Sequence, residues 1–155
     1  MRRQNHYDHF PKVDARRVNR TLESAMRPPQ SSRRDEFLFA TAQKVVDRTM
    51  VSLPPELKEG LAGIPVVLET VPSPLLVEDG IDPDLLGLFC GGDYVAEEGG
   101  YDPIPAQILL YLENIWDYSD RDPGIFRDEV RRTLLHEIGH YLGLDEDDLA
   151  ARDLD

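Results

Sequence analysis

The chain has 155 residues, 30 acidic and 17 basic side chains, a formal net charge of −13 and one cysteine, Cys90. This length suits one domain with a core of its own, and a single cysteine excludes an intrachain disulfide. With no leader peptide and no long apolar run visible, we expect a soluble protein of a reducing compartment, the cytoplasm.

The charge is divided unevenly along the chain. Residues 1–34 hold nine Lys or Arg and three Asp or Glu, a balance of +6, so the remaining residues hold eight and twenty-seven, a balance of −19. We interpret residues 1–33 as a basic, disordered tail, in which His6 and His9 lack a rigid scaffold, and residues 34–155 as a single domain. The acidic domain predicts no nucleic-acid or membrane partner and favours basic peptides or cations, although acidity also serves solubility alone.

Apolar periodicity predicts the elements that precede the last helix. An amphipathic helix is expected over Arg34–Met50, and Pro54 and Pro55 interrupt it. The segments expected next are a short helical turn over Leu57–Leu61 and strands over Ile64–Val71, Leu85–Cys90 and Ala106–Ile115, the last leading to the loop YSDRDPG.

The last predicted helix begins near Asp122 and ends near Gly143. Asp122 can act as the N-cap, Pro123 suits the first turn, and Gly143 can end the helix in a left-handed conformation. Its apolar stripe consists of Phe126, Val130, Leu134, Ile138, Tyr141 and Leu142.

A second face of this helix carries polar residues. At 100° per residue, the apolar stripe centres roughly opposite His136 and His140, which share their side with Glu129 and Thr133. We therefore expect the core and a functional site to use different faces of one helix.

The stretch HEIGHYLGLDE, residues 136–146, has residue types suited to zinc chemistry. Side chains at i and i+4 project to the same side of a helix, so His136 and His140 can both reach one ion. A catalytic zinc takes three protein ligands and leaves one position for water. Glu137 points about 100° around the axis, where a carboxylate can act as the general base that takes a proton from the attacking water.

A third ligand is expected after the turn at Gly143. Glu146 lies ten residues beyond His136, and by analogy with zinc-peptidase motifs this spacing returns a ligand to the ion. Three neighbouring acids remain alternatives, namely Asp145, Asp147 and Asp148.

The same stretch resembles the extended zincin motif, HExxHxxGxx followed by an acidic residue, and the body from Arg34 resembles the small bacterial zincin-like metallopeptidase family. The resemblance implies a minimal α+β fold, with a small three- or four-stranded mixed sheet packed against an N-terminal helix and a C-terminal active-site helix. It also implies one Zn²⁺ ion held by His136, His140 and Glu146, with Glu137 as the general base. The family more often has Asp where this chain has Glu146, and no methionine follows Gly143 as in the Met-turn of larger relatives.

These residues predict a zinc-dependent peptidase whose substrate is a peptide or protein held along a strand edge, such as Leu85–Cys90. The alternative is a zinc-binding module without turnover, although a structural zinc needs no base and usually closes with four protein ligands. An acidic adaptor for basic partners is a third reading, based on charge alone. Cys90 is expected to be buried filler. The candidates for stabilising an oxyanion are Tyr94, Tyr101, Tyr111 and Tyr118.

Overall fold

Three short strands form a mixed sheet in the computed structural model, which describes residues 32–91 and 106–152. β1 (Val66–Glu69) pairs in parallel with β3 (Gln107–Tyr111), and β2 (Gly87–Cys90) pairs antiparallel with β3, so the order is β1-β3-β2. All five residues of β3 are buried, as is typical of a central strand covered on both faces. The prediction of an α+β fold with a small mixed sheet is confirmed.

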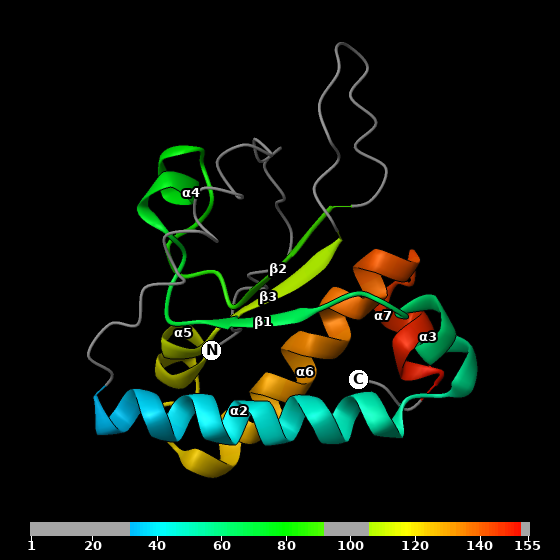
Figure 1. Ribbon diagram of the computed structural model, residues 1–155, viewed down its shortest axis with the longest axis horizontal. Helices are drawn as coiled ribbons and strands as arrows, with labels where there is room; N and C mark the ends of the chain where they lie inside the picture. The colour runs from blue at the N-terminus through cyan, green and yellow to red at the C-terminus, as the bar shows by residue number, and fades with distance from the viewer. Residues whose placement is uncertain (1–31, 92–105, 153–155) are drawn as a thin grey trace.

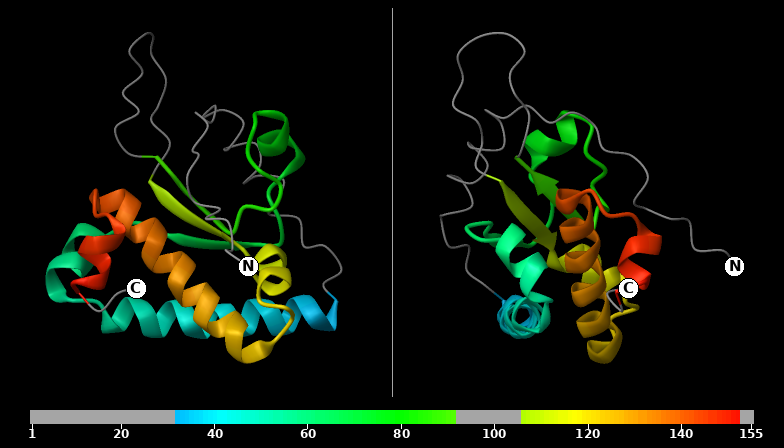
Figure 2. Two further views of the ribbon diagram at one scale, coloured as in Figure 1. Left: turned by 180° about the vertical axis from the view of Figure 1, so that it is seen from behind. Right: turned by 90° about the vertical axis from the view of Figure 1, so that its right-hand side faces the viewer.

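Helices α2 (Arg33–Ser52), α5 (Leu112–Tyr118) and α6 (Pro123–Leu142) lie on one side of the sheet, and the short helix α4 (Pro74–Glu78) lies on the other (Figure 1). Because side chains alternate along β3, Ile108 and Leu110 join the core beneath α2 and α6, whereas Leu109 and Tyr111 join a smaller cluster with Leu76 of α4. Figure 2 shows α6 crossing α2 obliquely on its side of the sheet. Two further short helices are α3 (Pro55–Gly60) and α7 (Glu146–Ala150).

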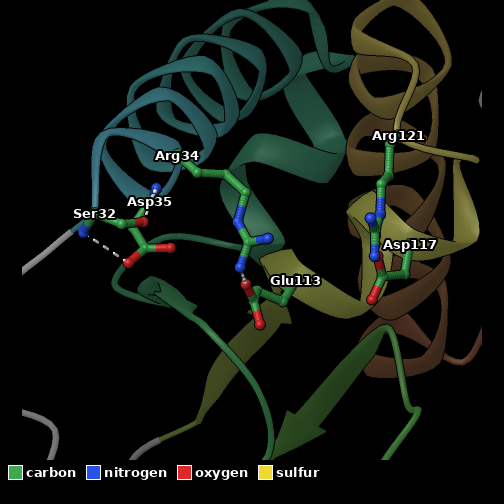
Figure 3. Close-up of polar contacts among 6 residues, drawn as sticks. All are labelled: Ser32, Arg34, Asp35, Glu113, Asp117 and Arg121. Atoms are coloured by element: carbon green, nitrogen blue, oxygen red, sulfur yellow. Dashed lines mark hydrogen bonds and ion pairs between the residues drawn. The ribbon is translucent and has the colours of Figure 1, made fainter.

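The start of α2 is fixed by local hydrogen bonds. Ser32 and Asp35 form a capping box in which each side chain accepts from the other's backbone N–H at 3.1 Å (Figure 3). Arg34 then forms an ion pair with Glu113, which joins α2 to α5. The helix predicted over Arg34–Met50 is thus present, and the tail predicted over residues 1–33 lies almost wholly outside the described residues.

Both predicted ends of α6 are confirmed. The Asp122 side chain accepts from the backbone N–H groups of Gly124 at 2.7 Å and Ile125 at 2.9 Å, and Pro123 occupies the first turn. Gly143 has a φ of 69°, and the N–H of Leu144 donates to the carbonyl of Gly139 at 2.8 Å. The chain therefore leaves α6 by a fixed left-handed turn.

The strand predicted over Ala106–Ile115 is wrong in its second half, which is helix α5. A short apolar run fits a buried strand and a buried helix equally well by composition. Leu112 and Ile115 are buried three residues apart, which is a helical period. Asn114 also donates to the carbonyls of Pro83 and Leu85, so α5 is held against the segment before β2. Helix α4 was not predicted, and within the described ranges no helix is long and apolar enough to cross a membrane.

Candidate metal centre

The two histidines of the motif meet on the last turns of α6. Their Nε2 atoms lie 2.7 Å apart and their ring centroids 4.4 Å apart, with the rings inclined at 79°. His136 is half-buried and His140 is exposed. The structure therefore brings the two imidazoles together, as their i,i+4 spacing predicts.

Glu137, between them in sequence, is buried rather than open to solvent. Its side chain is 1% exposed, and Oε2 has no hydrogen-bond partner among the described residues. Burial raises the pKa of the Glu137 carboxyl to about 8, against a smaller opposing effect of a hydrogen bond from the Phe89 backbone. Glu137 is thus held against β2 and is a stronger base than an ordinary carboxylate.

The polar face of α6, opposite the apolar stripe, is partly buried in the protein interior. Thr133 is fully buried and Glu129 is 5% exposed, although both were grouped on the side opposite the apolar stripe. Glu129 is neutralised by Arg132, with Nη1 2.6 Å from Oε1. The reason is tertiary: β2 and β3 pack against α6, and this contact covers residues that helix periodicity alone assigns to a polar side.

The segment after Gly143 carries the proposed third ligand. Asp145 and Asp148 form a reciprocal cap at the start of α7: the Asp148 N–H donates to Asp145 Oδ1 at 2.8 Å, and the Asp145 N–H donates to Asp148 Oδ2 at 3.2 Å. Glu146 is the first residue of α7, and its side chain lies outside what the structure describes. Two of the four acids considered are therefore engaged in a helix cap.

The described residues supply part of a zinc site. Two nitrogen ligands of a tetrahedral zinc stand roughly 3.3 Å apart, so the imidazoles of His136 and His140 need to separate by only about 0.6 Å from their present 2.7 Å. Among the described side chains, no group of three or more His, Cys, Asp or Glu is gathered so as to hold a metal ion. The described side chains do not include that of Glu146.

The cysteine and the four tyrosines considered from the sequence differ in where the structure places them. Cys90 is buried, and burial, followed by the nearby charges of Glu69 and Glu137, raises its thiol pKa to about 12, as expected for an inert filler. Tyr111 is fully buried, and its hydroxyl has no hydrogen-bond partner among the described residues. Tyr118 is half-buried against the core. Tyr94 and Tyr101 lie outside the described residues.

Two residues that lie beside Glu137 were not predicted from the sequence. Gly87 of β2 lies so close to α6 that a Cβ there would stand 2.7 Å from Thr133 Cγ2 and 3.2 Å from Glu137 Oε1, and Phe89 supplies the backbone hydrogen bond to Glu137. The only signal in the sequence was a glycine inside an apolar strand, which marks a close approach of another group.

The raised pKa of Glu137 predicts how the stability of the metal-free protein changes with pH. Because the folded-state pKa of about 8 exceeds the ordinary 4.5, the folded state holds this proton over a range where the unfolded state has released it. The contribution to stability is therefore complete below about pH 4.5 and is lost as the pH rises toward 8, by an amount on the order of a few kcal/mol. Urea unfolding of metal-free protein across this range measures it. Glu137→Gln should flatten the profile, and an unchanged slope in that variant would assign the effect elsewhere.

Comparisons with known proteins agree with this geometry at the level of a family. A family model described as zincin-like metallopeptidase matches residues 61–155, which is more than half of the chain. The matched range contains all three strands, α6 and α7. No curated protein sequence matches the chain.

Proposed function

The chain belongs to the zincin-like metallopeptidases, a family of zinc-dependent hydrolases, and from that premise we propose that it hydrolyses peptide bonds with Glu137 as general base and with zinc held by His136, His140 and Glu146. One observation carries the proposal: the Nε2 atoms of the two histidines lie 2.7 Å apart while the Glu137 carboxyl, one residue along, is buried against β2.

The two histidines are suited to the role of ligands. Their Nε2 atoms lie 2.7 Å apart on neighbouring turns of α6, and a neutral imidazole nitrogen is a common zinc ligand. Bound zinc supplies Lewis-acid polarisation of a carbonyl and activation of a water molecule. His136 and His140 would hold the ion, and the fixed turn at Gly143 brings α7 directly after them.

Glu137 is proposed to move the proton. Burial raises the pKa of the Glu137 carboxyl to about 8, so this group takes up and releases a proton at mildly alkaline pH, as transfer of a proton from water to the leaving amine requires. Its Oε2 is buried and has no hydrogen-bond partner among the described residues, so taking up a proton there breaks no hydrogen bond that the structure shows. A purely structural zinc has no use for such a group, which favours catalysis over a zinc-binding module without turnover.

Strand β2 is proposed to hold the substrate. It lies at the edge of the described sheet and directly against α6. An extended peptide can add to such an edge through backbone hydrogen bonds, apart from the N–H of Phe89, which already donates to Glu137. The balance of −19 over the residues after 34 supports a substrate with basic side chains.

The test of the proposed function combines metal analysis with a cleavage assay. Purified protein should contain one zinc per chain and cleave an unstructured peptide library, a chelator should abolish cleavage, and added zinc should restore it. Stoichiometric zinc without cleavage would favour the module. Protein that takes up no zinc even when zinc is supplied would contradict both.

The third ligand can be tested by making the same change at two neighbouring residues. We expect Glu146→Gln to weaken zinc affinity by roughly a hundredfold or more, because a ligand is lost, and losing even a residue that hydrogen-bonds to a ligand costs about 10–100-fold. Asp145→Asn keeps a good N-cap while removing the charge, so zinc affinity should stay within about threefold. Competition with a fluorescent chelator measures both. The reverse pattern would make Asp145 the ligand.

A further inference from the structure

Gly87 and the general base occupy one crowded place in the molecule. An ideal Cβ at Gly87 would lie 2.7 Å from Thr133 Cγ2, 3.1 Å from Glu137 Cγ and 3.2 Å from Glu137 Oε1. Two of these three nearest atoms belong to Glu137, so its carboxyl occupies space that any other residue at position 87 would fill.

The direction of the β2 backbone explains the contact with Glu137. The N–H of Tyr111 donates to the carbonyl of Leu86 at 2.9 Å, so Leu86 and Tyr111 stand at a hydrogen-bonded position of the ladder. Residues of an antiparallel strand alternate in this respect, so Gly87 and Phe89 direct their polar backbone groups away from β3. The Phe89 N–H is one of these outward groups, and Glu137 accepts its hydrogen bond.

We propose that Gly87 is a positioning residue for the reaction: by having no side chain, it leaves the space in which Glu137 reaches the outward N–H of Phe89, and so fixes the position of the proposed base. This inference rests on the proposed function for its catalytic consequence. Its structural part, that residue 87 decides where the Glu137 carboxyl lies, stands on the distances alone.

A methyl group at position 87 would displace Glu137 for a specific reason. Thr133 is fully buried and β-branched on a helix, so its side chain has little freedom to rotate away. The longer Glu137 side chain has more torsions through which it can yield. Removing the Thr133 methyl opens the nearest of the three contacts, which gives the added methyl another place to go.

The experiment compares Gly87→Ala, the double variant Gly87→Ala/Thr133→Ser, and the control Gly60→Ala. The control adds the same methyl against α6, but 3.0 Å from the flexible end of Leu142. We expect Gly87→Ala to lower kcat by about ten- to a hundredfold at little change in KM and zinc content, as misplacement of a base by about 1 Å does. The double variant should recover most of the loss, and Gly60→Ala should match the wild type.

Hydrogen exchange of the Phe89 amide in the metal-free protein provides a readout that needs no turnover. Gly87→Ala should accelerate it by about tenfold or more as the bond to Glu137 is lost. The alternation of the ladder directs the amides of Leu88 and Cys90 toward β3, so they should keep their protection.

These outcomes separate the inference from the proposed function. Equal acceleration at residues 88, 89 and 90 would mean that the strand itself has loosened, and would overturn the positioning role. Unchanged kcat and unchanged Phe89 exchange in Gly87→Ala would also overturn it while leaving the peptidase proposal intact. If the wild type cleaves nothing, the peptidase proposal fails, and selective exchange at Phe89 still supports the control of Glu137 by Gly87.

Discussion

Replacing Glu137 by Gln is expected to lower the turnover of a peptide substrate by roughly 10²–10⁴-fold, which is the usual contribution of a general base. The amide has nearly the same shape as the carboxyl but cannot take a proton from water. Because Glu137 is not expected to be a zinc ligand, zinc content should remain at one per chain. Single-turnover hydrolysis of one defined peptide, with metal analysis of the same sample, measures both quantities.

A second buried glutamate on the same helix provides the matched control. Glu129 is 5% exposed and pairs with Arg132, and it lies two turns before Glu137. Glu129→Gln makes the same chemical change inside α6, so a loss of turnover caused only by disturbing the helix would appear there too. Wild-type turnover in Glu137→Gln would remove this residue from the mechanism.

Loss of either histidine should have the second large effect, on zinc affinity rather than on the proton transfer. His136→Ala and His140→Ala each remove one of the two nitrogens that now lie 2.7 Å apart. We expect each variant to bind zinc more than about a hundredfold more weakly, since even outer partners of metal ligands contribute 10–100-fold. Calorimetric titration of metal-free protein measures the affinity.

The control for the histidine variants is the pair His6 and His9, which lie outside the described residues. Their replacement by Ala should leave zinc affinity unchanged if the ion is held on α6. Retained affinity in His140→Ala together with lost affinity in the tail variants would place the ion elsewhere and contradict the proposed site.

The two ends of α6 could be predicted from a few neighbouring residues in the sequence. Asp122 caps its first turn, Gly143 ends it with a positive φ, and the spacing of His136 and His140 puts their rings on one side. Each of these follows from helix geometry alone. The amphipathic helix expected at α2 is present, and its buried positions include Leu38, Ala42 and Val46, which recur every four residues.

Features that depend on distant contacts were not predictable. The apolar run after Ala106 continues without a break from β3 into α5, and the hydrogen bonds of Asn114 to the segment before β2 are a distant contact that helps to distinguish the two. The burial of Glu137 needs β2 to cross α6, and Gly87 precedes Glu137 by fifty positions in the chain. The motif therefore predicts the candidate zinc ligands and the proposed base, whereas the packing of β2 on α6 decides how Glu137 is held.

The strand order has a consequence for how the protein is made. β3 is the last strand to be synthesised, yet it lies between the other two, and β1 and β2 do not pair with each other in the described sheet. Until the chain has been synthesised as far as Tyr111, the two apolar segments that become β1 and β2 therefore have no β3 to pair with. Pairing across such long stretches is slow. Emergence of β3 from the ribosome thus sets the earliest moment at which β1 and β2 cease to be exposed sites for aggregation or chaperone binding.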